Sequence, residues 1–274
     1  MAPFSGLNPK PGVDECMRIA TNNRIRHFAC PSGGERRYNS SGAPGIRIRA
    51  CRRTPPGRDT RSSENGELVP IYHITHLRNL ESILQFAGLC SENSTAQKQV
   101  EAVSIAHAHI KERRGRRVVP VAQGGTLNDY IPFYFAPRSP MLYAIHKGNV
   151  EGYQDGQGPI LHLVSSVESV VEAGLPFAFT NGHAEMAVSD FFDSTDRLDE
   201  VDWKIMKAKY WADTDDDNDR CRRRLAEFLV HEFFPWELCS MVGAMNSGTA
   251  DEVNEILAKR HHRPKVKIKQ GWYY

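Results

Sequence analysis

Short apolar runs alternate with segments of helical period from about residue 68 to the end of the chain. The first run, LVPIYHIT at 68–75, predicts a strand, and the leucines spaced three and four positions apart after Thr75 predict a helix that Gly88 closes. Further apolar runs predict strands at 118–121, 130–135, 160–165, 177–180, 227–234, 240–245 and 266–274. Helical spacing and capping residues predict helices at 96–114, 141–146 and 249–259, the last with Thr249 as its N-cap.

Strands and helices therefore follow one another in a mixed order. No glycine-rich loop follows the first strand and no Walker loop is present, so a dinucleotide-binding Rossmann domain is not supported. The pattern favours an α+β fold built on a small antiparallel or split sheet with surrounding helices.

Residues 1–67 differ from the rest of the chain. The stretch from 31 to 65 is rich in Gly, Ser, Pro and Arg without a helical or strand period, apart from one or two helical turns expected near 13–25. Residues 1–69 hold 12 Lys and Arg against 6 Asp and Glu, whereas the remainder holds 23 against 27. We interpret 1–67 as a basic, disordered extension before a domain at 68–274. It is either an arm that contacts nucleic acid or, as we favour, an extension without a role.

Composition limits where the protein works. Mean hydropathy is -0.49 and no apolar run approaches about 20 residues, so a transmembrane helix is excluded, and no secretory signal is recognisable. The six cysteines form no CxxC pair and no His/Cys cluster with zinc-ligand spacing. These features predict a cytoplasmic protein with free thiols and no metal site.

Three segments carry candidate chemistry, and each has a structural alternative. His73, on the same face of its strand as Thr75, suits a ribose or phosphate contact, but such a histidine is more often a core residue. The block at 129–143 is the most aromatic segment, suited to stacking on a planar ring or to core packing. Its prolines predict an edge or irregular strand. Glu227 lies among apolar residues and either serves chemistry or pairs with an arginine just upstream.

Two further motifs are weaker. The arginine run at 113–117 is either a solvated helix end or a contact for phosphates. His183, in a turn after a predicted strand, is by itself an ordinary turn residue.

Four blocks in this order resemble one known family. They are YHITHLRNL at 72–80, DYIPFYFAPRSPMLY at 129–143, FTNGHA at 179–184 and AEFLVHEFFPWE at 226–237, with GWYY at the end. Together they resemble the DarT family, the DNA ADP-ribosyltransferase toxins of DarTG toxin–antitoxin systems, and within it the thymidine-modifying branch. The resemblance covers residues 68–274.

The resemblance implies an ADP-ribosyltransferase fold, whose split β-sheet binds NAD in a central cleft, and transfer of ADP-ribose from NAD to a base of single-stranded DNA. It makes Glu227 the catalytic carboxylate. It also implies an arginine, in the helix before the second core strand, that contacts both the base and this Glu, with Arg113 and Arg114 left as alternatives. It assigns His73, Thr75, Tyr134 and Tyr143 to NAD, and His183, Arg138 and Arg116 to DNA. It also implies a macrodomain antitoxin that removes the mark, a monomer, and no metal.

The chemistry suits these residues. Loss of nicotinamide creates positive charge on the ribose, which a nearby carboxylate stabilises, and the attacking base must be reachable outside a duplex stack. The acidic run at 213–219 is expected to lie away from the DNA. Two other functions stay open: ADP-ribosylation of RNA or protein, and a non-catalytic module that binds single-stranded nucleic acid.

Overall fold

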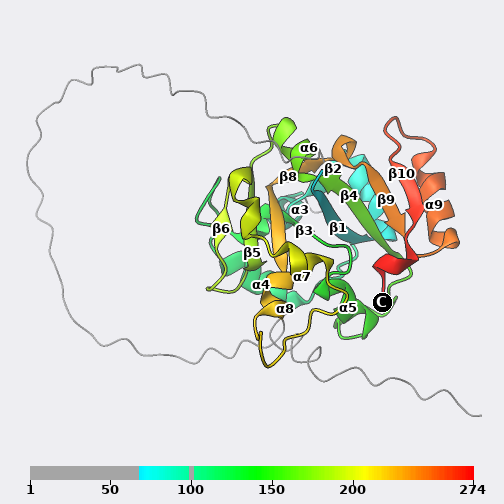
Figure 1. The fold of residues 1–274 in the computed structure, drawn as a ribbon. Helices are drawn as coiled ribbons and strands as arrows, with labels where there is room; N and C mark the ends of the chain where they lie inside the picture. The colour runs from blue at the N-terminus through cyan, green and yellow to red at the C-terminus, as the bar shows by residue number, and fades with distance from the viewer. Residues whose placement is uncertain (1–67, 99–101) are drawn as a thin grey trace, which may run out of the picture. The chain divides into compact units, whose positions relative to one another are not determined.

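The computed structural model of this protein describes residues 68–98 and 102–274 (Figure 1). The expectations for 1–67, including the short helix near 13–25, lie outside the described residues. No helix in the described part is long and apolar enough to cross a membrane.

A mostly antiparallel sheet organises the described residues. Its strand order is β10-β9-β4-β1-β3-β7-β5-β6, and only β9 and β10 run parallel. In chain order its strands are β1 (Pro70–His76), β3 (Tyr130–Tyr134), β4 (Ile160–Ser166), β5 (Phe177–His183), β6 (Phe191–Phe192), β7 (Ala226–His231), β9 (Met241–Ala244) and β10 (Lys265–Ile268). A second, two-stranded sheet joins β2 (Gly88–Cys90) to β8 (Phe233–Pro235).

The large sheet is split between β1 and β3. β1 pairs with β4 along its whole length but meets β3 only where Tyr72 lies opposite Tyr134. The carbonyl of Pro132 points toward β1, where it accepts a hydrogen bond from Nδ1 of His73 at 2.8 Å. Since the amide N and carbonyl of one strand residue face the same neighbour, the missing N–H of proline also faces β1 and cannot extend the ladder. Of the predicted edge or irregular strand, the edge alternative is wrong, because β3 is a central strand. Pro132 is tolerated there because the sheet opens between β3 and β1.

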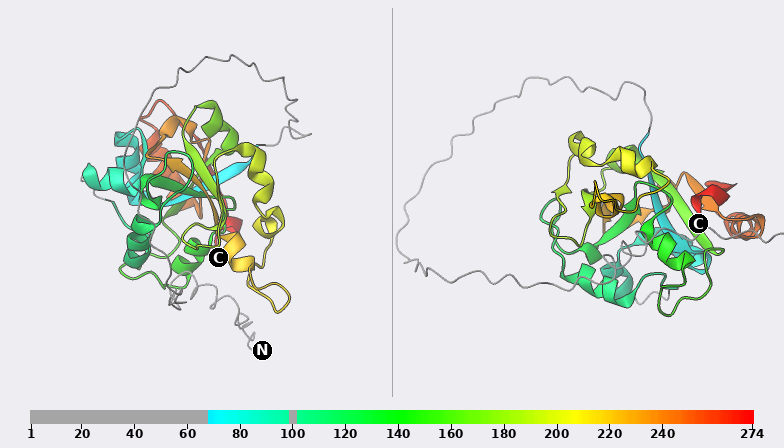
Figure 2. Two further views of the ribbon diagram at one scale, coloured as in Figure 1. Left: turned by 90° about the vertical axis from the view of Figure 1, so that its left-hand side faces the viewer. Right: turned by 60° about the horizontal axis from the view of Figure 1, so that its bottom comes forward.

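Helices lie around both faces of the twisted sheet, as Figures 1 and 2 show from three sides. They are α2 (Leu80–Gln85), α3 (Glu92–Gln97), α4 (Ala108–Arg116), α5 (Pro140–His146), α6 (Val167–Glu172), α7 (Trp203–Lys207), α8 (Arg220–Arg224) and α9 (Ser247–Leu257). The C-terminal residue, Tyr274, returns to the start of α5, where its hydroxyl donates to the carbonyl of Arg138 at 3.2 Å. The predicted α+β class with a split sheet and surrounding helices is confirmed.

Several predicted boundaries were wrong, each for a local reason. The strand predicted at 227–234 is two strands in different sheets, because Glu232 takes a left-handed conformation (φ 55°) between β7 and β8. The helix predicted at 96–114 is α3 and α4, and the described residues 102–107 before α4 are not helical. The strand at 118–121 is only an isolated bridge from Val118 to Thr126.

The helix and strand predicted at the C-terminal end also shift. α9 is capped by Asn246, whose side chain accepts from the amide of Thr249, so Thr249 is not the cap. β10 ends at Ile268, and a 3-10 turn follows at Gln270–Trp272. This turn places the Trp272 ring edge-on to Tyr72, with centroids 5.2 Å apart, and so covers the sheet with an aromatic side chain that an extended strand would expose.

Two apolar clusters fill the part of the chain that the structure describes. The larger includes Phe133, Phe179 and Phe228, all fully buried. The smaller gathers Tyr130 and Leu229 with Val119, Leu127, Ala178 and Ala184. Side chains alternate along a strand, so each of β3 and β7 contributes to both clusters. Ile131 and Phe133 of β3 face the larger cluster, as do Phe228 and Val230 of β7, whereas Tyr130 and Leu229 face the smaller one.

The cysteines match the expected free thiols only in part. Cys90 and Cys239 carry free thiols. Cys221 is disulfide-bonded, so the prediction of free thiols is wrong at that position.

Candidate active site

The register of β3 and β7 places the carboxylate that the sequence singles out. Tyr134 lies directly opposite Glu227, so both side chains project from the same face of the sheet. The next pair, Phe133 opposite Phe228, projects into the larger apolar cluster. Glu227 is thus a buried carboxylate, 3% exposed, on a strand whose remaining residues are almost all apolar.

Arg114 of α4 neutralises this carboxylate. Its Nη1 lies 2.9 Å from Oε2 and 3.2 Å from Oε1 of Glu227, and both side chains are largely buried. Burial acts to lower the pKa of Arg114, but the Glu227 carboxylate outweighs it and the net pKa is raised. The other nitrogen, Nη2, is buried and has no hydrogen-bond partner among the described residues. An unpaired buried donor is costly, which makes Nη2 the natural donor to a bound ligand.

The structure also distinguishes the two neighbouring arginines. Arg113 donates from Nε to the carboxylate of Glu185 at 2.8 Å, and that carboxylate is 7% exposed. Burial raises the pKa of Glu185, and Arg113 opposes that effect. Arg114 is therefore the arginine on Glu227. The arginines just upstream of Glu227 point elsewhere: Arg222 and Arg223 pair with aspartates, and Arg224 donates to backbone carbonyls.

The FTNGHA segment forms an irregular bulge beside Glu227. β5 pairs with β7 at Phe179, opposite Phe228, and again at His183, opposite Ala226, so three residues of β5 bulge out against one of β7. Thr180 is fully buried, and its hydroxyl donates to the carbonyl of Gly182 at 2.7 Å and accepts from the amide of Glu227 at 3.1 Å. The threonine hydroxyl thereby satisfies the backbone groups that the interrupted ladder leaves without partners.

His183 ends this bulge opposite Ala226, next to Glu227 in the sequence of β7, and interacts electrostatically with Glu227 and Arg114. Its Nδ1 accepts a hydrogen bond from the amide of Glu185 at 3.2 Å. Since an acceptor nitrogen carries no proton, the proton of the neutral ring is on Nε2. Burial lowers the pKa of His183 to about 4, and the Glu227 charge only partly opposes this. His183 is therefore a neutral hydrogen-bond donor at ordinary pH.

A cavity of about 460 Å³ opens beside these groups. It falls within the range of about 300–1,000 Å³ usual for small-molecule sites. His73, Thr75, Arg114 and Tyr134 are among the lining residues, together with Met141 of α5. Glu227 is not among the described lining residues, but Arg114, which pairs with it, and Tyr134, which lies opposite it in the sheet, both line the cavity. Burial raises the pKa of Tyr134, as does the Glu227 charge, so its hydroxyl stays protonated.

His73 has a defined tautomer in this cavity. Its Nδ1 is bonded to the carbonyl of Pro132, and a carbonyl only accepts, so Nδ1 carries the proton. Burial lowers the pKa of the ring, which stays neutral. The other nitrogen, Nε2, is then a hydrogen-bond acceptor.

Four of the residues predicted to contact substrate, His183 among them, are not described as lining this cavity. Tyr143 is not among its described lining residues and packs instead against the rings of Trp211 and Tyr274. The Arg138 guanidinium lies over the Tyr274 ring, 4.5 Å from its centroid. Arg116 is exposed near the end of α4 and pairs with Glu112.

Comparison with known proteins decides the family. The family model described as "ssDNA thymidine ADP-ribosyltransferase, DarT" matches residues 72–274. The chain belongs to the DarT family. A DNA ADP-ribosyl transferase from Thermus sp. (strain 2.9) is 47% identical over 210 residues, which cover 76% of this chain and 97% of that protein. A protein of the same name from Escherichia coli O127:H6 is 32% identical over 216 residues, covering 79% of this chain and 98% of its own length.

Solved structures agree with the DarT assignment. Thermus sp. 2.9 DarT in complex with ADP-ribosylated single-stranded DNA superposes with a TM-score of 0.71 at 45% identity, covering 75% of this chain and 96% of that one. The same protein in complex with NAD+ gives 0.67 at 43% identity, covering 76% and 98%. The predicted family, fold, DNA ADP-ribosyltransferase activity and use of NAD are confirmed. In the described part of the chain, no group of three or more His, Cys, Asp or Glu is placed to hold a metal ion.

Sequence reasoning missed several DarT residues that the structure brings to the site. Thr180 and Gly182 lie inside the FTNGHA block. The only available signal for them was their membership in that block. Glu185 follows that block directly, but nothing in the sequence paired it with Arg113, 72 positions earlier. Arg222 was considered only as a partner for Glu227.

Proposed function

We propose that this chain transfers the ADP-ribosyl group of NAD to a thymine of single-stranded DNA, and that Glu227 and Arg114 carry the reaction. The buried Arg114–Glu227 pair beside the cavity is the main observation in support, because its orphaned Nη2 needs an acceptor that a ligand would supply. The family description and the two Thermus complexes support the same acceptor and the same donor.

On the NAD side, the cavity offers one acceptor and two hydroxyl groups. Nε2 of His73 is the acceptor for a ribose hydroxyl, because its Nδ1 proton is already committed to Pro132. Thr75 and the protonated hydroxyl of Tyr134 line the same cavity and complete the polar contacts. Tyr143 supports this wall from behind through α5, whose Met141 reaches the cavity.

The reaction needs negative charge where the nicotinamide leaves. The bond from the ribose carbon to nicotinamide breaks, nicotinamide keeps the electron pair, and positive charge develops on the ribose. The Glu227 carboxylate stabilises that charge in a site from which water is largely excluded. A base nitrogen then forms the new bond to the same carbon.

Thymine fits the remaining groups. Its N1 is bound to deoxyribose, so N3 is the ring nitrogen that carries a proton and can form the new bond after losing it. Glu227 accepts that proton, and the orphaned Nη2 of Arg114 donates to a carbonyl next to N3. The neutral Nε2–H of His183 is a second donor on this side. Arg116 and Arg138 are proposed to contact the DNA backbone, where exposed Arg116 can exchange Glu112 for a phosphate.

The decisive experiment compares acceptors. Purified protein is incubated with labelled NAD and single-stranded DNA, the same strand without thymine, the same sequence as RNA, and duplex DNA. Label confined to thymine-containing single strands supports the proposal. Label on RNA or on protein would establish the other acceptor, and no label with intact NAD binding would favour the non-catalytic module.

A matched pair of variants tests the residue roles. Glu227→Gln and Arg114→Lys should each abolish labelling while an NAD-induced rise in melting temperature persists, because ligand binding to the folded state stabilises it. Full labelling by Glu227→Gln would remove Glu227 from the mechanism.

The biological setting follows from the family. We propose that the protein acts as a cytoplasmic, monomeric toxin whose partner is a macrodomain antitoxin that removes ADP-ribose from DNA. The fold is also shared with Thermosipho africanus DarTG in complex with ADP-ribose, at a TM-score of 0.63 and 17% identity. Co-expression with a macrodomain hydrolase should restore growth to cells expressing this chain, and an inactive hydrolase should not.

A further inference from the structure

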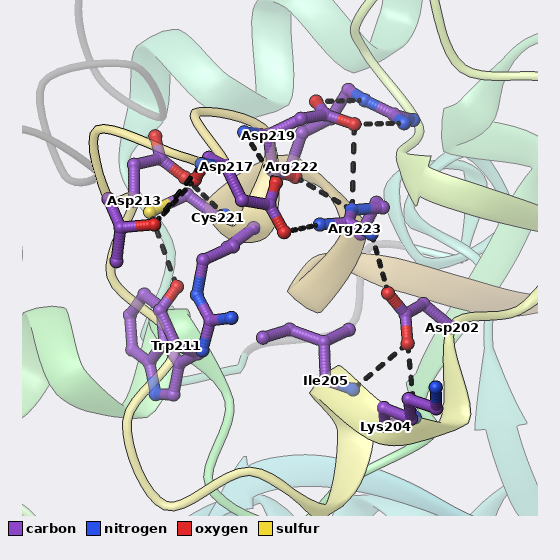
Figure 3. A network of polar contacts seen from close by, with 12 residues as sticks. Asp202, Lys204, Ile205, Trp211, Asp213, Asp217, Asp219, Cys221, Arg222 and Arg223 are labelled. Atoms are coloured by element: carbon purple, nitrogen blue, oxygen red, sulfur yellow. Dashed lines mark hydrogen bonds and ion pairs between the residues drawn. The ribbon is translucent and has the colours of Figure 1, made fainter.

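Arg222 connects helix α8 to the loop that carries His183. Its Nε and Nη2 each donate to one oxygen of Asp219, both at 2.7 Å (Figure 3). Its third nitrogen, Nη1, donates to Oδ1 of Asn181 at 3.3 Å and to Oγ of Ser189 at 3.2 Å. The Asp219 fork fixes the guanidinium plane, so Nη1 holds a defined position.

These two contacts hold both ends of one loop. Asn181 lies two residues before His183 and Ser189 six residues after it, and Asn181 also bonds to Asp190 through its side chain. The Arg222 side chain is only 12% exposed. The loop that carries His183 is closed by hydrogen bonds between Asn181 and Asp190, and Arg222 adds a largely buried contact to both of its ends.

Gly182 makes this crossing possible. A Cβ at position 182 would lie 2.2 Å from Nη1 and 2.9 Å from Cζ of Arg222. No other residue could occupy position 182 without displacing the guanidinium. The glycine of FTNGHA thus leaves the space that the Arg222 guanidinium occupies.

We propose that Arg222 is a positioning residue for transfer to DNA: it fixes the loop at 181–189, and with it His183, against Glu227. This inference rests on the proposed function, since it concerns the acceptor side of the site. α8 leads directly into β7, so the helix that carries Arg222 is joined by the backbone to the strand of Glu227 and by hydrogen bonds to the loop of His183. A displacement of about 1 Å in such a group can cost about 100-fold in rate.

The neighbouring arginine provides a matched control. Arg223 lies on the same helix and pairs with Asp202 at 2.6 Å and with Asp217, as Figure 3 shows, but makes no hydrogen bond to the 181–189 loop among the described residues. Arg222→Ala and Arg223→Ala each remove partly exposed ion pairs of α8, and each removes a contact to Asp219. Only Arg222→Ala also removes hydrogen bonds to the 181–189 loop.

The test uses the full chain and measures the melting temperature, its increase with NAD, and kcat/KM for a thymine-containing single strand. We expect Arg222→Ala to lower kcat/KM by about 10- to 100-fold relative to Arg223→Ala, with an unchanged NAD-induced shift in melting temperature. Arg222→Lys, which keeps the charge but cannot make all these bonds at once, should fall between Arg222→Ala and the wild type. Equal kcat/KM for Arg222→Ala and Arg223→Ala would overturn the inference.

A double variant tests the route through the bulge. Gly182→Ala should lower kcat/KM about as far as Arg222→Ala, and adding it to Arg222→Ala should lower it no further, because the clash is with the missing side chain. A full additional loss in the double variant would show that Arg222 is not the intermediary. Failure of the wild type to label single-stranded DNA would instead reject the proposed function, whatever the variants do.

Discussion

Thr180→Val tests the structural basis of the bulge, because valine has nearly the shape of threonine and no hydroxyl. Thr180 is fully buried, and its hydroxyl holds two backbone groups, the amide of Glu227 and the carbonyl of Gly182. Valine would leave both groups without a partner in a site that water does not reach.

The cost can be worked from these two contacts. Leaving a buried polar group unsatisfied costs about 1–3 kcal/mol, so the pair amounts to about 2–6 kcal/mol. For a protein of this size each kcal/mol shifts the melting temperature by about 2–4 °C, which predicts a decrease of about 10 °C. Transfer to DNA should fall as well, since the same hydroxyl links the strand of Glu227 to the bulge that carries His183.

Thermal and urea unfolding of three variants checks this reasoning. Thr180→Ser keeps the hydroxyl and should retain most of the transfer activity, with a loss of about 1 kcal/mol for the buried methyl. Thr195→Val, at an exposed position, should stay within about 0.5 kcal/mol of the wild type. If Thr180→Val were as stable and as active as the wild type, the hydroxyl would not support the bulge and the account given for the FTNGHA order would be wrong.

Three further outcomes follow from the site. Arg114→Leu should abolish transfer, whereas Arg113→Leu should retain it, because Arg113 pairs with Glu185 rather than with Glu227; a steady-state transfer assay separates them. Glu227→Ala should lower the unfolding free energy by about 3–5 kcal/mol, since it strands the Arg114 charge, and Glu227→Gln by less; urea titrations measure both. The pKa of His183 is about 4 when folded, below its ordinary value, so the unfolded chain binds the extra proton. Stability should therefore fall from about pH 6.5 toward pH 4 by on the order of 3 kcal/mol from this ring, and His183→Gln should flatten that slope in urea midpoints taken at pH 7.5 and 5.

The sequence alone reached the fold class, the main strands and the family. Apolar periodicity identified β1, β3, β4, β5 and β9 because strand residues buried against a core must be apolar at regular positions. Glu227 stood out for the converse reason, since a carboxylate is costly among apolar neighbours. The family resemblance then supplied the chemistry that periodicity cannot show.

What the sequence could not determine depended on contacts between distant segments. Composition does not tell Arg113 from Arg114, because both precede Gly115 on one helix and only their directions differ, one toward Glu185 and the other toward Glu227. The break at Glu232 was likewise not predicted, since apolar residues resume directly after it at Phe233 and only pairing with β2 draws β8 into a second sheet.

The features of the site therefore fall into two groups, those that depend on neighbouring residues and those that depend on residues far apart in the sequence. Local pattern determined that β7 is a buried strand carrying one carboxylate, because burial and alternation are properties of neighbouring residues. Tertiary structure alone decided which arginine meets that carboxylate, which hydroxyl satisfies its backbone amide and which guanidinium crosses Gly182. Those choices join residues between 40 and 113 positions apart, which only the folded chain brings within contact distance.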